Sequence, residues 1–230
     1  MKNHIKLNGV DYLSGIAIKI SDMHQLVEEN LKNIIKEGDK IIDIGGGPGM
    51  GARIIDHYGI KAKVLNIEPC NTVDEIPKLS NIEYIPLKQT FKEALSSNLP
   101  WLADIVLMVS AEHEIALSNE KSNIENKKIF FQDLIKFLDK NTKEGGIYCV
   151  GFPNYKKGIS NDNLIKQRRY SDSKVGHSHS PDEFFTIDEF QDFFSTTPII
   201  HVQKPMILDD EKAEETCLLA NFAAFYVKGT

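Results

Sequence analysis

The sequence predicts an α/β protein built on a seven-stranded sheet of five parallel strands plus a C-terminal antiparallel hairpin, with helices on both faces. Three observations carry this prediction. Short apolar runs alternate with segments of helical periodicity along most of the chain. A glycine-rich turn separates the first such run from a helix. The last two β-rich runs are joined by an acidic stretch that leaves no room for a crossover helix, which favours an antiparallel pair.

The elements of this sheet can be placed in order along the chain. The parallel strands are predicted at Lys40–Ile44, Ala62–Ile67, Ile82–Pro86, Ile105–Val109 and Gly146–Gly151, and the hairpin strands at Ile199–Leu208 and Leu218–Val227. Helices are predicted at Gly51–Tyr58, Phe91–Ser96, Lys127–Leu138 and Ile187–Phe194. Because a strand, a glycine turn, a helix and a strand follow one another, the first two strands form a right-handed βαβ unit.

Two segments are expected to cover this sheet within a single domain of residues 1–230. Residues 1–38 are predicted to form a helical cap, since Met23–Ile35 carries apolar residues at helical spacing after capping residues and before Gly38. The polar segment 153–185 is too long for a simple connection and follows the fifth strand, at the sheet edge where ligands of open α/β sheets bind. We predict a lid or substrate-selecting insertion there, with a solvated surface loop as the alternative.

Composition narrows the class of protein. The 230 residues include 27 Lys and Arg against 33 Asp and Glu, a net charge of −6, which argues against a protein that grips nucleic acid through phosphate charge. No apolar run of about 18 residues and no apolar leader occurs, so a cytoplasmic enzyme without a membrane partner is expected. The three cysteines lack metal or disulfide spacing and are expected to be buried thiols.

The strongest functional signal is the sequence IIDIGGGPGMGA, which spans Ile41–Ala52. Gly45, Gly47 and Gly49 let the backbone turn sharply and approach a ligand without interference from a Cβ atom. The helix that follows directs its N-terminal amides to the same place. The next strand delivers Glu68, a carboxylate suited to accept hydrogen bonds from both hydroxyls of a ribose.

This arrangement resembles motif I and the second-strand acid of class I S-adenosylmethionine-dependent methyltransferases, in which an acid and one residue precede Gly-x-Gly-x-Gly. Asp43 and the three glycines match it position by position. The resemblance implies a Rossmann-like methyltransferase fold, S-adenosylmethionine as methyl donor and S-adenosylhomocysteine as product. It places the donor against residues of four strand ends: Asp43, Gly45, Gly46, Gly47, Gly49, Glu68, Pro69, Lys88, Gln89 and Ser110. The family often has an acid near Lys88 and Gln89, which this chain lacks; recognition of the adenine by the backbone or amide of Gln89 and a solvated loop are the two alternatives there.

A nicotinamide dinucleotide is the competing ligand, because Gly47, Gly49 and Ala52 also satisfy the looser dinucleotide fingerprint, with Glu68 at a tolerable spacing. Asp43 weighs against it. Its carboxylate would lie near the turn that receives a pyrophosphate, whereas the cationic amino and sulfonium groups of S-adenosylmethionine favour a nearby anion. A purely structural glycine turn is the third alternative.

The residues after the fourth strand carry the expected chemistry. Ala111–Glu114 contains neither the Asn/Asp-Pro-Pro-aromatic motif nor the Pro-Cys motif of enzymes that methylate nucleic acids, which disfavours both classes. His113 is the candidate base that accepts a proton from a hydroxyl acceptor. The alternative is a histidine at the start of a helix that bonds the backbone or Glu114. His177 and His179, in the predicted lid, are further candidates, and a solvated loop is their alternative. No metal is expected.

The acceptor is expected to be a small molecule. Basic residues outnumber acids between Asn154 and His179, and Arg168 and Arg169 favour an anionic acceptor, although a charge run often only solvates a surface. The resemblance also points to Tyr12 and Tyr155 as pocket aromatics. The sequence therefore predicts methyl transfer to an oxygen or nitrogen of a small molecule by a monomer or homodimer. The alternatives are a protein or peptide methyltransferase and a non-catalytic S-adenosylmethionine-binding module.

Overall fold

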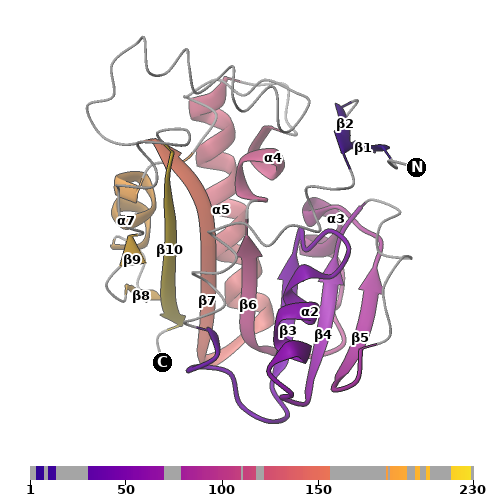
Figure 1. Cartoon of the computed structure of the whole chain (residues 1–230). Coiled ribbons are helices and arrows are strands. Elements are labelled where there is room, and N and C mark those ends of the chain that lie inside the picture. Colours follow the sequence, from indigo (N-terminus) through magenta and orange to yellow (C-terminus); the bar gives the residue numbers. More distant parts are fainter. Residues whose placement is uncertain are drawn as a thin grey trace.

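A computed structural model gives the structure of the chain (Figure 1). It describes residues 4–7, 10–13, 31–69, 79–109, 111–117, 122–155, 185, 187–195, 200–202, 206–207 and 219–228. The strands are β1 (His4–Leu7), β2 (Val10–Leu13), β3 (Lys40–Ile44), β4 (Ala62–Ile67), β5 (Ile82–Leu87), β6 (Ala103–Val109), β7 (Thr142–Tyr155), β8 (Ile200–Val202), β9 (Met206–Ile207) and β10 (Leu219–Lys228). The helices are α2 (Met50–His57), α3 (Phe91–Ser96), α4 (Glu112–Leu117), α5 (Asn123–Asn141) and α7 (Ile187–Ser195).

The main sheet has the strand order β5-β4-β3-β6-β7-β10-β8, with β9 also paired to β10. The first five of these strands are parallel, which confirms the predicted α/β class and its parallel sheet. Strand β10 runs antiparallel to β7, β8 and β9. The parallel strands all end at one edge of the sheet, where α4 follows β6 (Figure 1).

The predicted count of seven strands is not confirmed, since the described part of the main sheet has eight. The predicted strand Ile199–Leu208 is divided into β8 and β9, which pair with separate parts of β10. Residues 203–205, between the two strands, lie outside the described part of the chain.

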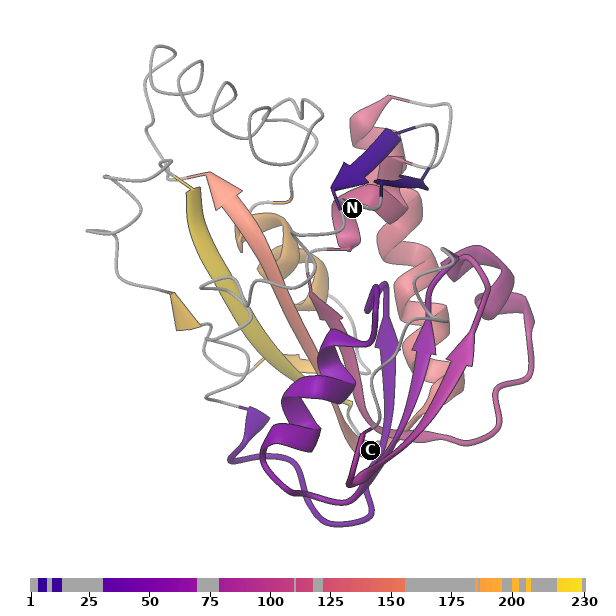
Figure 2. The same cartoon turned by 45° about the vertical axis from the view of Figure 1, so that its right-hand side comes forward.

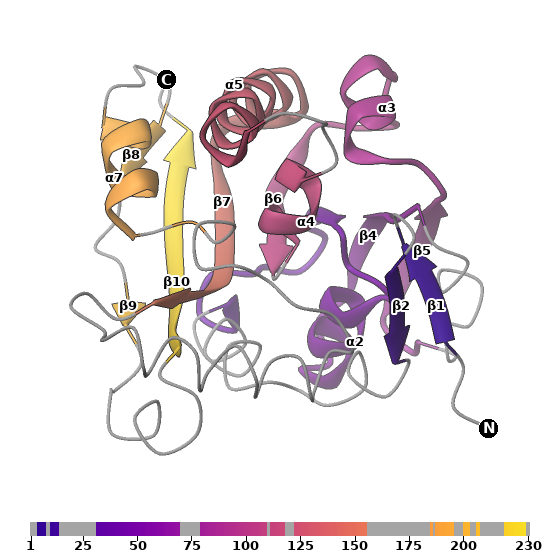
Figure 3. The same ribbon diagram turned by 90° about the horizontal axis from the view of Figure 1, so that it is seen from above.

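Alternate residues of the strands build two cores, one on each face of the sheet. Ile42, Ile44 and Leu65 face a core that contains residues of α3, α4, α5 and α7. Ile41 and Val64 face the other core, which α2 and the segment around Leu31 cover. Figures 2 and 3 show α2 and α5 on opposite faces of the twisted sheet. The prediction of helices on both faces is confirmed.

An aromatic cluster joins α5 to α7 on one face. Its rings lie 4.2 to 5.9 Å apart between centroids and belong to Phe130, Phe131, Phe185, Phe190, Phe193 and Phe194. Lys127 spans the two helices through its ion pair with Glu189, at 3.1 Å. Phe185 is therefore a core residue, and residues 153–155 at the other end of the predicted insertion belong to β7. Residues 156–184 lie outside the described part of the chain, so the lid stays a prediction.

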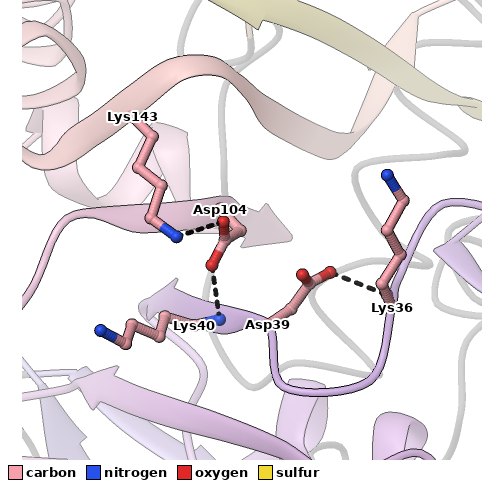
Figure 4. Close-up of polar contacts among 5 residues, drawn as sticks. All are labelled: Lys36, Asp39, Lys40, Asp104 and Lys143. Atoms are coloured by element: carbon pink, nitrogen blue, oxygen red, sulfur yellow. Dashed lines mark hydrogen bonds and ion pairs between the residues drawn. The ribbon is translucent and has the colours of Figure 1, made fainter.

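At the amino ends of the strands, charged groups tie β3, β6 and β7 together (Figure 4). Asp104 accepts a hydrogen bond from the backbone amide of Lys40 at 2.9 Å and forms an ion pair with Lys143. Asp39 accepts from the backbone amide of Lys36 at 2.8 Å, and its pKa is raised by partial burial and by the nearby Asp104. These contacts lie at the edge opposite the glycine turn, so they hold the sheet and not the ligand site.

The N-terminal region departs from the prediction of a helical cap in residues 1–38. β1 and β2 form an antiparallel ladder in which Leu7 is opposite Val10. The two intervening residues, Asn8 and Gly9, are the strongest short-range signal for a hairpin turn, and the sequence prediction overlooked it. Residues 14–30, which hold most of the predicted helix, lie outside the described chain. Within the described helices, none has the length and apolar character needed to span a membrane.

Candidate functional site

The glycine turn connects β3 to α2 at the carboxyl edge of the sheet. Gly45, Gly47 and Gly49 have φ angles of +67°, +53° and +78°. Residues other than glycine rarely adopt this region of backbone conformation. Gly49 is also the N-cap of α2 and provides no side chain to cap the helix. The amides of the first helical turn are thus left to backbone contacts, other side chains or a ligand.

Asp43 lies beneath this turn. Its carboxylate is buried, and Oδ2 accepts a hydrogen bond from the amide of Gly51 at 3.1 Å. Burial raises the pKa of Asp43 to about 7, the Gly51 hydrogen bond opposes the rise, and the nearby Glu68 adds to it. A Cβ atom on Gly46 would lie only 2.2 Å from Oδ2 of Asp43, so position 46 must be glycine for a steric reason even though its φ is not positive.

Glu68 follows β4, the strand next to β3, and its carboxylate reaches the turn. Oε2 accepts a hydrogen bond from the amide of Gly47 at 3.0 Å, and only 6% of the residue is exposed. The backbone amide of Glu68 donates to the carbonyl of Leu87 at 3.1 Å, which continues the pairing of β4 with β5 beyond the strand end. The structure thus places Glu68, the residue predicted to bind the ribose, directly against the predicted glycine turn. Pro69, the next residue, is half-buried.

Two residues that the sequence analysis did not select complete this cluster. Asn66 on β4 is fully buried, and its Nδ2 donates to the carbonyl of Gly47 at 2.9 Å and to the hydroxyl of Tyr84 at 2.7 Å. A Cβ atom on Gly49 would lie 3.1 Å from the ring of Tyr84 on β5, so this ring lies close to the turn. Burial raises the pKa of Tyr84 to about 12, so its hydroxyl stays protonated at neutral pH. A polar Asn between the apolar residues Leu65 and Ile67 was the available signal.

The side of the turn toward β6 is tightly packed. A Cβ on Gly45 would lie 2.3 Å from the Cβ of Ala111, which starts the connection to α4. Glu112, the next residue, is completely buried. His113 lies in the first turn of α4, but its side chain is outside the described part of the structure, and so is Ser110.

Lys88 and Gln89 lie between β5 and α3, at the same edge of the sheet. The side chain of Lys88 is exposed, whereas Oε1 of Gln89 accepts a hydrogen bond from the hydroxyl of Ser97 at 3.1 Å. Thr90 and Glu93 then form a capping box that starts α3. Gln89 is therefore oriented toward α3 by its amide oxygen, and Lys88 is the more accessible of the two side chains.

The remaining predicted site residues fall on or beyond the limits of the described chain. Tyr12 lies in β2, in the ladder found beyond the carboxyl edge of the sheet in Figures 1 and 3, and Tyr155 ends β7 opposite Leu219. Their side chains are not described. Four further predicted residues lie wholly outside the described part of the chain: Arg168, Arg169, His177 and His179. Their predicted roles stay predictions.

Comparison with known proteins places this geometry in a fold. No protein-family model and no curated protein matches the sequence. A SAM-dependent methyltransferase from Thiobacillus denitrificans, solved in complex with S-adenosyl-L-homocysteine, is 16% identical with a TM-score of 0.55, over 89% of this chain and 91% of that one. The chain has the fold of SAM-dependent methyltransferases.

Two further structures with this fold have different described roles. The N-methyltransferase NodS from Bradyrhizobium japonicum is 9% identical with a TM-score of 0.56, over 91% of this chain and 98% of that one. A chain from the complex of the Haloferax volcanii Trm112 methyltransferase activator with a putative methyltransferase is 13% identical with a TM-score of 0.60, over 94% of this chain and 95% of that one. These likenesses establish the fold, and the residues of the turn must carry any functional argument.

Proposed function

We propose that this protein transfers a methyl group from S-adenosylmethionine to an oxygen or nitrogen of a small-molecule acceptor. One observation carries the proposal: the buried carboxylates of Asp43 and Glu68 contact the glycine turn through the amides of Gly51 and Gly47, at 3.1 and 3.0 Å. Two acids around one turn favour a ligand with a cationic end and a ribose, and they oppose the pyrophosphate of a nicotinamide dinucleotide.

In this proposal the donor lies across the carboxyl ends of β3, β4 and β5. The carboxylate of Glu68 accepts hydrogen bonds from the ribose hydroxyls, and the N-terminal amides of α2 favour the carboxylate of the methionine half. The negative charge of Asp43 favours the cationic amino and sulfonium groups. S-adenosylmethionine supplies a methyl carbon already activated by positive sulfur, so the chain's main task is to align the acceptor with it.

The acceptor side of the proposal rests on residues beyond the described part of the site. Arg168 and Arg169 would bind an anionic group of the acceptor, and Tyr12 and Tyr155 would line the pocket. His113, His177 or His179 would accept the proton when the acceptor is a hydroxyl. The N-methyltransferase NodS shows that an enzyme of this fold can methylate nitrogen.

The donor half is tested by calorimetric titration of the purified chain with S-adenosylhomocysteine, and with NAD⁺ as the competing ligand. We expect binding of the first in the micromolar range, on the order of −8 kcal/mol, and none of the second. Tight binding of NAD⁺ without binding of S-adenosylhomocysteine would overturn the proposal.

A matched pair of variants places that binding in the turn. Gly47 and Gly59 both have positive φ, +53° and +70°, and a Cβ on either would meet nothing within 4 Å. Gly47→Val and Gly59→Val therefore impose similar backbone strain, but only the first lies in the proposed donor site. We expect S-adenosylhomocysteine binding to be lost in Gly47→Val alone.

The acceptor half is tested by release of S-adenosylhomocysteine from S-adenosylmethionine in the presence of acceptor panels. Turnover with small anionic alcohols, phenols or amines supports the proposal. Turnover only with peptides would favour a protein methyltransferase. Donor binding without turnover across both panels would favour a non-catalytic binding module.

A further inference from the structure

Asn66 and Tyr84 form a polar clamp beneath the glycine turn, which we call the Asn–Tyr clamp. The Nδ2 group of Asn66 donates to both the Gly47 carbonyl and the Tyr84 hydroxyl, at 2.9 and 2.7 Å. The orientation of the Asn66 amide is fixed by chemistry, since the Gly47 carbonyl can only accept and must face the NH₂ group. Residues of β4 and β5 are thus joined to the backbone of the β3–α2 turn.

The clamp acts on the part of the turn that has the least local restraint. Residues 45, 47 and 49 are glycines at positive φ, and the N-cap of α2 forms no side-chain capping hydrogen bond. Both polar groups of Gly47 are instead held by β4, because Glu68 accepts from its amide and Asn66 donates to its carbonyl. Asn66 and Glu68 are two residues apart, so they project to the same side of the extended chain.

The two hydrogen bonds of Gly47, with Glu68 and with Asn66, would respond differently to binding of the donor. Glu68 then shares its carboxylate with the ribose hydroxyls, which weakens its hold on the Gly47 amide. Asn66 is completely buried and keeps its contact with the Gly47 carbonyl. The Tyr84 hydroxyl accepts from the same Nδ2, and its ring packs against Gly49, so the clamp reaches a second glycine of the turn.

Strand packing alone does not account for an asparagine at this position. Oδ1 of Asn66 is buried and has no hydrogen-bond partner within the described chain, and a buried polar atom without a partner lowers stability. An aliphatic residue, like the neighbouring Leu65 and Ile67, would avoid that cost. The hydrogen bond to the turn is what the asparagine adds.

We propose that Asn66 and Tyr84 are positioning residues that hold the glycine turn in the shape that receives the methyl donor. This inference rests on the proposed function, since it names residues that shape the same site. Neither residue is assigned a chemical step. Their contribution is to fix the peptide of Gly47 before the donor arrives, so that less conformational freedom is lost on binding.

The experiment compares Tyr84→Phe with Tyr148→Phe. Each variant deletes one hydroxyl, and Tyr148 lies on β7 in the opposite core, where its hydroxyl contacts the sulfur of Met108 at 3.7 Å. Calorimetry should give about 3- to 10-fold weaker S-adenosylhomocysteine binding for Tyr84→Phe, the loss expected for one hydrogen bond, and no change for Tyr148→Phe. Equal affinity in Tyr84→Phe and the wild type would overturn the inference.

A second pair tests the amide itself. Asn66→Leu removes the contact with the turn, whereas Asn141→Leu removes a buried amide whose Nδ2 donates to the Phe137 carbonyl at 3.0 Å, within α5. We expect Asn66→Leu to weaken binding by more than about 10-fold, because two hydrogen bonds are lost. Asn141→Leu should lower the unfolding temperature and leave the affinity unchanged. If Asn66→Leu does not fold, the Tyr84→Phe result decides.

Hydrogen exchange separates failure of the clamp from failure of the proposed function. Without ligand, the amides of the peptide covering the turn should exchange faster in Tyr84→Phe than in Tyr148→Phe. If the wild type fails to bind S-adenosylhomocysteine but this difference is present, the proposed function is wrong while the clamp stands. If the two variants exchange alike, the clamp is wrong even if the wild type binds the donor product.

Discussion

Replacement of Asp43 by asparagine should make the protein more stable at pH 8 and weaken its binding of the donor. The carboxylate is buried beneath the glycine turn, and its pKa rises from 3.8 to about 7, chiefly because burial disfavours the charged form. Ionised Asp43 therefore lowers the stability of the fold, and asparagine keeps the shape and an acceptor oxygen for the Gly51 amide without the charge.

The sign and size of the effect follow from proton linkage. Between pH 3.8 and about 7 the folded state holds a proton on Asp43 that the unfolded state has released, so this group's contribution to stability is full below pH 3.8 and declines as the pH rises through 7. Raising the pKa by about three units lowers the free energy of unfolding by roughly 4 kcal/mol once Asp43 is ionised. Burying the NH₂ group that asparagine introduces costs about 1–3 kcal/mol of stability, which offsets part of the gain from removing the charge. We expect a net gain of about 1–3 kcal/mol at pH 8.

The assay is urea unfolding of the wild type and Asp43→Asn from pH 4.5 to 8.5, with Asp188→Asn on the exposed first turn of α7 as control. The stability difference between Asp43→Asn and the wild type should rise with pH and level off above about 7. The control variant measures the effect of removing one exposed carboxylate. A flat curve for Asp43→Asn, or a loss of stability at pH 8, would refute a buried acid with a raised pKa.

Two of the three other predictions address the same turn, and the third addresses the opposite edge of the sheet. Gly46→Ala should lower the free energy of unfolding by several kcal/mol, because its Cβ would clash with the carboxylate of Asp43. Gly47→Ala, whose Cβ meets nothing, should lower it by only about 1–2 kcal/mol through backbone strain. Urea unfolding of both variants compares these losses. Glu68→Gln keeps an acceptor for the Gly47 amide but loses its charge, so calorimetry should show about 10-fold weaker S-adenosylhomocysteine binding, and unchanged affinity would exclude a ribose role. Lys143→Met should lower stability by less than about 1 kcal/mol, because its ion pair is partly exposed, and should not alter donor affinity.

The parallel part of the sheet could be predicted because its central strands β3, β4 and β6 are mostly buried. Ala62–Ile67 and Phe91–Ser96 have the predicted bounds, and the helix predicted from Gly51 begins one residue earlier, at Met50. Each strand is a short apolar run bounded by polar or glycine residues, a pattern that needs no knowledge of its partner. Positive φ at Gly45, Gly47 and Gly49 likewise follows from local chemistry, since glycine is the residue that adopts it without cost.

The parts that were missed depend on pairing between distant segments or on turns that were given too little weight. The β1–β2 ladder carries an Asn-Gly signal that was overlooked, and α4 has only six residues, too few for a periodic pattern. Asn66 was missed because its importance comes from register: it lies opposite Asp43 on the neighbouring strand. That alignment, and the reach of Tyr84 from β5, cannot be read from a single sequence without knowing the register.

The glycine motif therefore does not determine the shape of its own turn. Glycine allows the positive φ angles at residues 45, 47 and 49, but it equally allows many other conformations, and each costs entropy to exclude. Here the exclusion comes from Asp43, Asn66, Glu68 and Tyr84, which reach the turn from three adjacent strands. Because the strand register fixes all four side chains, any ligand that requires this turn is sensitive to the pairing of β3, β4 and β5. A destabilised edge strand β5 should then weaken donor binding before it unfolds the sheet.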